Sequence, residues 1–260
     1  MQDLKVSLIQ ADQIWEDKSA NFSMYERYFN ELIDVDLILL PEMFQTGFTM
    51  NTEKLSEDWQ ASEGIEFLKQ WSNKLQSAIY TSLIINEEEK IYNRGIFVFP
   101  DGAITKYDKR KSFGLGGEDK HFTAGDQETI VTWKGWKINL QICYDLRFPE
   151  MIRNRMEGEK AAYDLLLYIA NWPEKRIEHW TTLLKARAIE NQCFVAGVNR
   201  VGTDGNVLKY SGGSVIYDAL GQCISTARNH QAEIVFGTLS GTELINTRKN
   251  LPFLKDCSIK

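Results

Sequence analysis

The sequence predicts an α/β fold in which two mixed β-sheets pack together with layers of helices. Apolar strands alternate with amphipathic helices along the chain, which is typical of layered α/β proteins. Hairpins with short polar turns interrupt this alternation, so we expect each sheet to mix parallel and antiparallel pairs. The pattern yields roughly ten or more strands, which exceeds what one open sheet holds comfortably and favours two packed sheets.

Each element is assigned from its own apolar pattern. Short apolar or alternating runs predict strands at residues 4–10, 35–40, 78–85, 91–99, 104–107, 128–133, 136–142, 164–170, 193–199, 213–217, 223–227 and 233–239. Helical spacing predicts helices at 19–33, 62–76, 149–155 and 177–192, the first capped by Ser19. Residues 112–125 contain four glycines and no regular pattern, which indicates a loop that is functional or disordered.

Length and composition suit one large domain spanning residues 1–260. The net charge of −6, with no basic run longer than Lys109-Arg110-Lys111, argues against a nucleic-acid partner. No apolar stretch is long enough to span a bilayer, and the first residues show no signal-peptide pattern, so we expect no membrane association. The four cysteines have no metal-type spacing, which favours reduced thiols in a cytoplasmic protein.

The segment 140–150, LQICYDLRFPE, places a cysteine at the end of an expected strand. In α/β folds, ligands bind in the crevice outside the carboxyl ends of strands, so a thiol there is well placed for chemistry. Most free cysteines are small buried hydrophobes, and Cys143 taken alone could be one of them. The rest of the chain favours the functional interpretation.

Two charged residues occupy the same kind of position as Cys143. Glu42 directly follows the buried strand 35–40, and Lys109 follows the strand 104–107 at the start of the glycine-rich loop. If these strands are neighbours, an ammonium would lower the pKa of the thiol, a carboxylate could move protons, and a fixed cation could stabilise an oxyanion. The three histidines stand in no motif typical of Cys-His enzymes. Glu42 by itself could equally be a solvated loop residue.

These residues lie in motifs that resemble the three signatures of the nitrilase superfamily of carbon-nitrogen hydrolases, in the right order. The resemblance covers nearly the whole chain and is closest to the omega-amidase branch, in particular to the bacterial omega-amidases. It implies a four-layer αββα sandwich with two mixed sheets, a homodimer, and no metal or organic cofactor. The matching stretches are 41–44 (PEMF), 107–110 (YDKR), 143–150 (CYDLRFPE), 171–173 (NWP), 186–192 (ARAIENQ) and 199–202 (NRVG).

The resemblance also implies roles for individual residues. Glu42 would be the general base, Lys109 the oxyanion stabiliser and Cys143 the nucleophile. The backbone N–H of Tyr144 would be the second oxyanion donor. Glu118 best matches a second glutamate that relatives carry in the loop after the lysine, although it could also be a solvated loop carboxylate.

The reaction implied is hydrolysis of the terminal amide of a short dicarboxylate monoamide, such as 2-oxoglutaramate or 2-oxosuccinamate, through a thioester. The free carboxylate of such a small-molecule amide must be desolvated, which favours an arginine partner. Arg147 is the first candidate, with Lys111 and Arg200 behind it; the alternative for Arg147 is a salt bridge within its own motif. Phe44 and Trp172 could wall the substrate chain or simply pack in the core. Lys111 stands where many relatives have histidine.

Other functions remain open at this stage. The same three groups would serve a general aliphatic amidase, a carbamoyl amidase or a nitrilase, because the pocket walls decide the substrate. A non-catalytic, ligand-binding relative and a thiol redox protein are further alternatives. The first would have kept all three groups without using them, and the second lacks a cysteine near Cys143 to act as its resolving partner.

Overall fold

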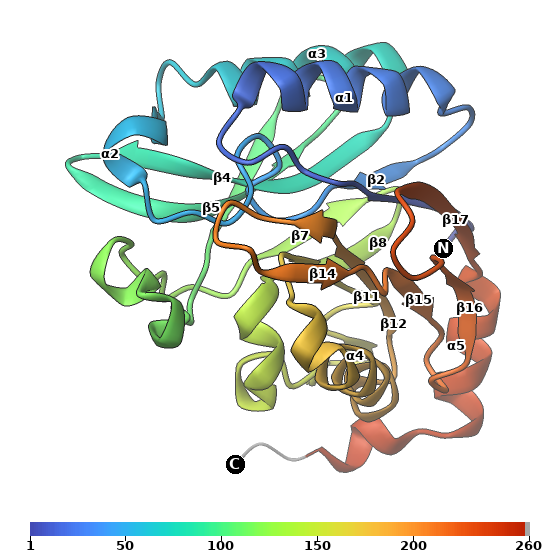
Figure 1. Ribbon diagram of the computed structural model, residues 1–260. Coiled ribbons are helices and arrows are strands. Elements are labelled where there is room, and N and C mark those ends of the chain that lie inside the picture. Colours follow the sequence, from blue (N-terminus) through green and yellow to red (C-terminus); the bar gives the residue numbers. More distant parts are fainter. Residues whose placement is uncertain (258–260) are drawn as a thin grey trace.

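The central strands of this chain bury both faces, and the structure shows what covers each face. In the computed structural model, which describes residues 1–257, two β-sheets pack face to face between two layers of helices (Figure 1). Alternate residues of one strand point to opposite sides of a sheet. In the strand 37–39, Leu37 and Leu39 therefore pack between the sheets, whereas Ile38 packs under the outer helices. The predicted αββα sandwich is confirmed.

The first sheet has seven strands in the order β17-β1-β2-β4-β5-β6, with β3 beside β4. The pairs β1–β2 and β2–β4 at its centre are parallel, whereas β17, β5 and β6 pair antiparallel. The strands are β1 (Leu4–Gln10), β2 (Leu37–Leu39), β3 (Glu57–Asp58), β4 (Ala78–Glu87), β5 (Lys90–Val98), β6 (Ile104–Asp108) and β17 (Glu233–Leu239).

The second sheet repeats this plan with six strands in the order β16-β15-β12-β11-β8-β7. Its central strands β8, β11 and β12 are parallel, and the outer ones are antiparallel. The strands are β7 (Ile130–Trp133), β8 (Trp136–Ile142), β11 (Leu165–Ala170), β12 (Phe194–Asn199), β15 (Val215–Tyr217) and β16 (Cys223–Thr226). Two small hairpins stand apart: β9 (Met156–Glu157) with β10 (Lys160–Ala161), and β13 (Val201–Thr203) with β14 (Lys209–Ser211).

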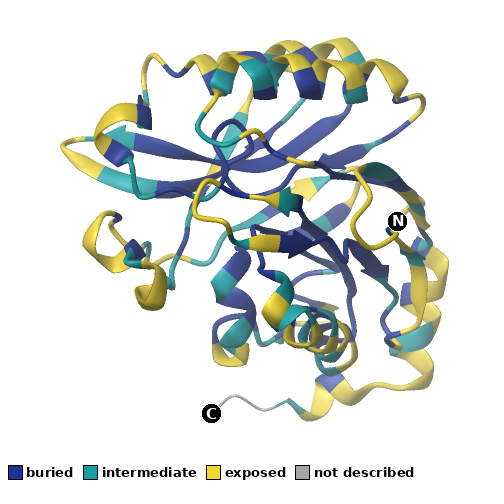
Figure 2. Cartoon of the chain, viewed as in Figure 1, coloured by how far each residue is buried: buried dark blue, intermediate teal, exposed yellow. Residues whose placement is uncertain are grey.

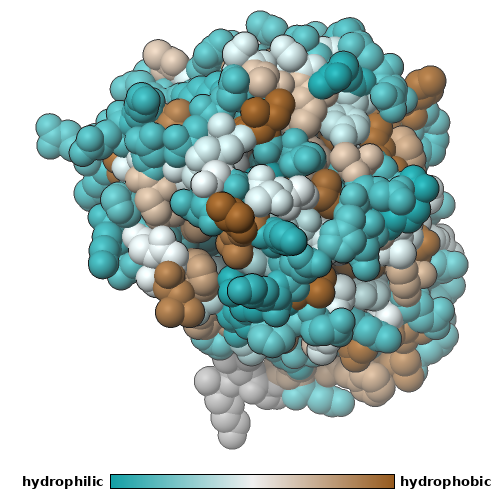
Figure 3. Space-filling model, viewed as in Figure 1, coloured by the Kyte–Doolittle hydropathy of each residue, from teal (hydrophilic) through white to brown (hydrophobic). Residues whose placement is uncertain are grey.

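The helices form the outer layers. They are α1 (Lys18–Glu31), α2 (Thr52–Leu55), α3 (Glu63–Leu75), α4 (Ile177–Asn191) and α5 (Gly241–Asn250). Figure 1 shows α1 and α3 covering the first sheet, with α4 and α5 on the opposite side of the molecule. The central strands of both sheets are buried, whereas the edge strand β16 is largely exposed and the outer helices are exposed on their solvent side (Figure 2). The surface in this view is mainly hydrophilic, with scattered apolar spots (Figure 3).

The helix expected at 149–155 is wrong. Only a 3-10 helix, Pro149–Met151, forms there, and the chain then runs into the β9–β10 hairpin. Tertiary contacts prevent the helix. Asn154 is fully buried, and its side chain donates to the carbonyls of Tyr163 and Asn191. Its backbone N–H donates to the Asn191 side chain. Hydrogen bonds to distant segments thus replace the ladder that a helix would need.

Three further expectations need correction. The first helix is capped by Asp17, whose carboxylate accepts from the Ala20 N–H, and not by Ser19. The glycine-rich loop folds into two 3-10 helices, Gly114–Gly116 and Glu118–Lys120. The C-terminal helix α5 was not expected from the sequence, because only Gly241 and Leu244 of its residues are buried and no apolar stripe marks it.

Within residues 1–257, no helix is both long and apolar enough to cross a membrane.

Candidate active site

The two sheets meet at one edge through residues that directly follow their strands. Glu42 lies three residues after β2, and Asn171 comes directly after β11 of the other sheet. The Asn171 backbone N–H donates to Glu42 Oε2 at 3.0 Å, and its side-chain amide donates to the Glu42 carbonyl at 2.5 Å. Both ends of Glu42 are therefore fixed by the opposite sheet.

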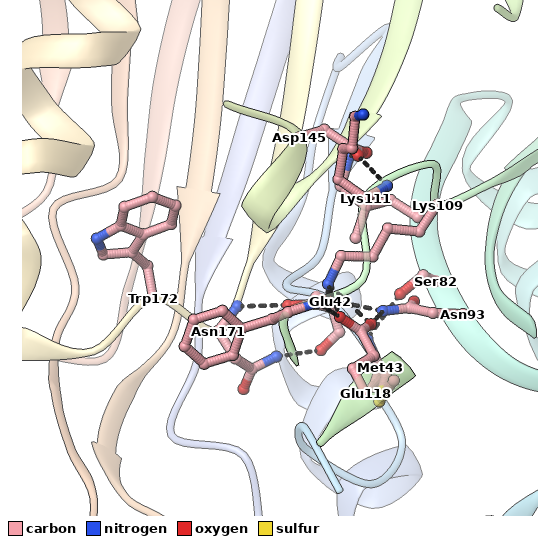
Figure 4. A network of polar contacts seen from close by, with 12 residues as sticks. Glu42, Met43, Ser82, Asn93, Lys109, Lys111, Glu118, Asp145, Asn171 and Trp172 are labelled. Atoms are coloured by element: carbon pink, nitrogen blue, oxygen red, sulfur yellow. Dashed lines mark hydrogen bonds and ion pairs between the residues drawn. The ribbon is translucent and has the colours of Figure 1, made fainter. Parts of the chain in front are cut away.

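A buried ion cluster surrounds Glu42. Lys109 Nζ lies 2.9 Å from Glu42 Oε1 and 2.9 Å from each carboxylate oxygen of Glu118. The Asn93 amide, from β5, donates to Glu42 Oε1 at 2.7 Å and to Glu118 Oε1 at 3.1 Å (Figure 4). Glu42 and Glu118 are fully buried and Lys109 is 3% exposed. Three of the residues singled out in the sequence are thus brought into direct contact.

Glu118 is buried inside this ion cluster. It is not a solvated loop carboxylate: the 3-10 turns of the loop carry it inward, and the Phe113 N–H donates to its Oε2 at 2.6 Å. A buried carboxylate without a partner would be expensive. The ammonium of Lys109, the Asn93 amide and this N–H together compensate it.

The charges in the cluster hold Lys109 in its protonated form. Burial alone would lower the pKa of the Lys109 ammonium, but the negative charges of Glu118 and Glu42 outweigh burial and hold that pKa above its ordinary value. Lys109 therefore stays a cation across the physiological pH range.

Cys143 begins a 3-10 helix, Cys143–Arg147, directly after β8. Its φ of 45° lies in the left-handed region, a strained conformation for a residue with a side chain, and such strain is often found at functional sites. Burial raises the pKa of the Cys143 thiol well above its usual range, and the charge of Glu42 raises it further; Lys109 acts in the opposite direction but is outweighed. The expectation of a lowered thiol pKa is therefore wrong, and the resting thiol is neutral.

Asp145 fixes the turn that carries Cys143. Its carboxylate accepts from the Ile142 N–H at 3.1 Å, the Lys111 N–H at 2.9 Å and the Tyr107 hydroxyl at 2.8 Å. It therefore links the end of β8 to the segment after Lys109. The neighbouring N–H of Tyr144 belongs to the first turn of the 3-10 helix, where N–H groups have no partner inside the helix.

Cys143 and Lys109 line a cavity of about 720 Å³. Its wall contains six aromatic side chains and charged side chains of both signs, and it is formed by the loops that follow the strands and by the β13–β14 hairpin. The aromatic, charged and amide side chains of the lining include Trp15, Glu16, Phe48, Phe113, Tyr144, Arg147, Asn171, Trp172, Arg176, Asp204 and Tyr210.

Arg147 and Trp172 both line the cavity and contact each other. The guanidinium carbon of Arg147 lies 4.6 Å from the centre of the Trp172 ring, and one of its nitrogens lies 3.2 Å from Nδ1 of His179. In the described part of the chain, Arg147 forms no ion pair within 4 Å, so the alternative of a salt bridge within its motif is wrong.

The remaining substrate-binding candidates lie elsewhere. Phe44 is fully buried in the core under α1, where it packs on Tyr25 and other aromatic rings. Lys111 lies outside the cavity lining, with its ammonium over the Phe148 ring. Arg200 is fully buried and pairs with Asp12 at 3.2 Å. None of the three side chains lines this cavity.

Several residues at the site were not found from the sequence. Asn93 lies in the middle of a strand, and nothing local distinguishes it from a solvated asparagine. Asn171 was noticed only as part of a matching motif. Arg176, just before α4, lies in an ordinary charged run. Residues 1–257 contain no cluster of three or more His, Cys, Asp or Glu side chains that could hold a metal ion.

A buried thiol beside an ammonium and two carboxylates, at the edge of an αββα sandwich, defines a candidate thiol hydrolase. Comparison with known proteins gives the family. The sequence matches the carbon-nitrogen hydrolase family over residues 5–249. The chain therefore belongs to this family, within the nitrilase superfamily, and is an amide carbon–nitrogen hydrolase.

Three relatives show how close the similarity is. The omega-amidase YafV of Yersinia enterocolitica is 43% identical, over 98% of this chain and 97% of its own length. The 2-oxoglutaramate amidase of Bacillus subtilis is 32% identical, over 96% of both chains. Among solved structures, XC1258 of Xanthomonas campestris, a CN-hydrolase superfamily protein with an arsenic adduct in its active site, is 40% identical, with a TM-score of 0.96 over 100% of this chain and 99% of its own.

From the pKa of the Asp145 carboxylate we predict that activity falls on the acid side of the pH profile. Burial raises its pKa to about 6, from an ordinary value of 3.8. The pKa of Asp145 is higher in the folded protein than in the unfolded chain, so folding favours the protonated acid. The contribution of Asp145 to the free energy of unfolding therefore decreases as the pH rises from about 4 to 6. Acid therefore does not unfold the protein through Asp145. It instead removes an acceptor from the turn that carries Cys143, and kcat should fall below about pH 6.

The check is a kcat–pH profile combined with circular dichroism at each pH. The Asp145→Asn variant imitates the protonated acid, so it should show at neutral pH the low activity that the wild type reaches in acid, and its profile should lack this fall. A variant that keeps the wild-type profile would remove Asp145 from the explanation.

Proposed function

We propose that this protein is an omega-amidase that hydrolyses the terminal amide of short dicarboxylate monoamides, such as 2-oxoglutaramate and 2-oxosuccinamate, to the acid and ammonia. Relatives that match nearly the full length of the chain carry the names omega-amidase and 2-oxoglutaramate amidase. The observation that carries the proposal is the pairing, in one cavity, of the Cys143 thiol with the Arg147 guanidinium, which has no carboxylate partner among residues 1–257.

In this proposal, acylation begins from the neutral thiol. Cys143 Sγ attacks the amide carbonyl carbon while Glu42 takes the thiol proton, so that no free thiolate has to persist in the buried site. The tetrahedral intermediate then collapses, the C–N bond breaks, and the proton on Glu42 passes to the leaving nitrogen. The products of this step are ammonia and a thioester on Cys143.

The oxyanion needs two donors, and the geometry supports Lys109 and the Tyr144 N–H for this role. All three protons of the Lys109 ammonium face carboxylate oxygens at 2.9 Å in the resting structure. One of them must therefore turn to the oxyanion. Glu118 can release it, because this carboxylate keeps its other contacts with Lys109, with Asn93 and with the Phe113 N–H.

Deacylation uses the same groups in reverse. Water attacks the thioester carbonyl while Glu42 takes one of its protons, the oxyanion is held as before, and the C–S bond breaks. The proton on Glu42 returns to the sulfur, which restores the neutral thiol. Because Glu42 is held by both Lys109 and Asn171, its carboxylate is fixed for both half-reactions.

Arg147 gives the cavity its selectivity in this proposal. A substrate carboxylate loses its hydration on entering the cavity, and a planar guanidinium can bind both of its oxygens. Trp172, which stacks on Arg147, would hold the guanidinium plane and contact the short aliphatic chain. A general aliphatic amidase or a nitrilase would have no use for an unpaired arginine at this place.

The assembly and the compartment are proposals as well. We propose a cytoplasmic homodimer, in keeping with the four free thiols. Exposed apolar side chains on α4 and the neighbouring β-hairpin support a subunit contact there. Ile189 is 48% exposed, Leu220 45% and Ile224 39%, and the glycine next to Leu220 approaches Ile189.

The first prediction concerns the nucleophile. Cys143→Ala should abolish turnover and keep the fold, because one sulfur is removed without opening a large cavity. Mass spectrometry of the wild type, quenched during turnover of a slow amide, should show an acyl adduct on Cys143. Cys193→Ala is the matched control, since that thiol is fully buried away from the cavity. An adduct on any other cysteine contradicts the mechanism.

The second prediction concerns the substrate. A site built around the substrate carboxylate should reject a neutral analogue strongly, because its arginine would be left unpaired in a desolvated complex. The measurement compares kcat/KM for 2-oxoglutaramate with that for pentanamide, and we expect the carboxylate substrate to be preferred by about a hundredfold or more. Equal values would move the assignment to a general aliphatic amidase.

The third prediction concerns assembly. Light scattering at micromolar concentration should give the mass of a dimer. Ile189→Asp should shift the mass towards the monomer, because it places a charge in an apolar contact. Leu115→Asp, at a residue 93% exposed on the glycine-rich loop, should leave the mass unchanged. A monomeric wild type would refute the proposal.

A further inference from the structure

The wall of the candidate active-site cavity contains a second arginine, Arg176, which the function proposed above does not use. It lines the same cavity as Cys143 and Arg147. Its guanidinium carbon lies 5.4 Å from the centre of the Phe113 ring. Its backbone is held in place, since its carbonyl accepts from the indole N–H of Trp172 at 2.7 Å. The side chain is therefore carried on a fixed support beside Arg147.

The charges around Arg176 are unfavourable in the free enzyme. In the part of the chain that the structure describes, its side chain forms no ion pair within 4 Å and no hydrogen bond. It stands at the N-terminus of α4, the positive end of the helix dipole, where a cation is destabilising. Burial lowers the pKa of Arg147, and the positive charge of Arg176 lowers it further, so the two cations repel each other.

The acidic side chains of the cavity do not relieve this repulsion. Glu16 accepts from the Thr49 hydroxyl at 2.5 Å and from the Asn51 amide at 3.1 Å. Asp204 accepts from the Tyr210 hydroxyl and from backbone N–H groups of the β13–β14 hairpin. Within residues 1–257, neither carboxylate forms an ion pair with Arg147 or Arg176 within 4 Å. Two unpaired guanidinium groups thus remain in a protein of net charge −6.

We infer that Arg176 is a specificity-determining residue that, together with Arg147, binds the free carboxylate of the substrate between two guanidinium groups. An anion placed between them would remove their mutual repulsion and the unfavourable interaction with the helix dipole at once. The Phe113 and Trp172 rings beside the two arginines would exclude water and strengthen both charged hydrogen bonds. This inference rests on the proposed function and names the residue that sets its selectivity.

The test is steady-state kinetics of Arg176→Met with 2-oxoglutaramate and with pentanamide. Loss of a charged hydrogen bond should raise KM for 2-oxoglutaramate by roughly ten- to a hundredfold, with kcat changed by less than about threefold. The kcat/KM for pentanamide should stay within about twofold of the wild type. Lys175→Met is the matched control, because this exposed neighbour lies outside the cavity lining. It should leave kcat and KM unchanged for both substrates.

Two additional measurements separate carboxylate binding from general damage. In a Cys143→Ala background, which cannot form the thioester, calorimetry should show that Arg176→Met weakens the binding of 2-oxoglutaramate, a readout independent of turnover. If both arginines bind one carboxylate, the effects of Arg147→Met and Arg176→Met on KM should not multiply in the double variant. Arg176→Lys keeps the charge without the planar fork, so its KM for 2-oxoglutaramate should lie between those of the wild type and Arg176→Met. It serves as the test should Arg176→Met fail to fold.

The outcomes distinguish this inference from the proposed function. If the wild type prefers 2-oxoglutaramate and Arg176→Met keeps that preference with an unchanged KM, the role of Arg176 is overturned and the omega-amidase proposal stands. An equal fall in kcat/KM for both substrates also overturns the role of Arg176, because such a fall indicates damage to the cavity as a whole. If the wild type itself shows no preference for the carboxylate, the proposed substrate class fails, and the role of Arg176 fails with it.

Discussion

The structure of the candidate active site depends on one buried ammonium shared by two buried carboxylates. Lys109 contacts Glu42 and Glu118 at 2.9 Å, and none of the three side chains is more than 3% exposed. A charge that loses its partner in such a place destabilises a protein by about 3–5 kcal/mol. The ends of β2 and β6 and the turns of the glycine-rich loop are therefore held together by electrostatics. Apolar packing between the sheets brings them close, and the ion cluster fixes their final positions.

Burial and the same cluster together determine the protonation state of the thiol. It already contains two negative charges and one positive charge, so a thiolate at Cys143 would add a further negative charge to a buried site with an excess of them. Burial raises the pKa of the Cys143 thiol most, the charge of Glu42 raises it further, and the thiol stays neutral although an ammonium lies nearby. In the proposed mechanism, a neutral thiol of this kind is activated when Glu42 accepts its proton during attack. Proton transfer and bond formation would then occur together.

Much of this could be predicted from the sequence, and the exceptions have physical causes. Glu42, Lys109 and Cys143 each follow an apolar strand, so local patterns made them candidates. Their strands are not neighbours, because β4 and β5 separate β2 from β6 and β8 lies in the other sheet, so the resemblance to the family was needed to assign their roles. The burial of Glu118 could not be predicted, because it depends on Asn93 from the middle of β5 and on an N–H of a 3-10 turn. The raised pKa of Cys143 is a sum over several charges and burial, which no motif encodes. The segment after Pro149 was misassigned because Asn154 pairs with residues far along the chain.

The distribution of charge along the cavity supports one orientation for the proposed substrate. At the Cys143 end, two carboxylates outnumber one ammonium, so a second carboxylate from a ligand would be repelled there. At the Arg147 end, two guanidinium groups have no negative partner within the described residues. A short amide with one free carboxylate would therefore enter with its neutral amide towards the thiol and its charge towards the arginines. The same asymmetry acts on the product: hydrolysis turns the amide into a second carboxylate beside Glu42, and the repulsion between them favours release. For the proposed substrate, one electrostatic gradient would thus favour both the productive orientation and the release of the product.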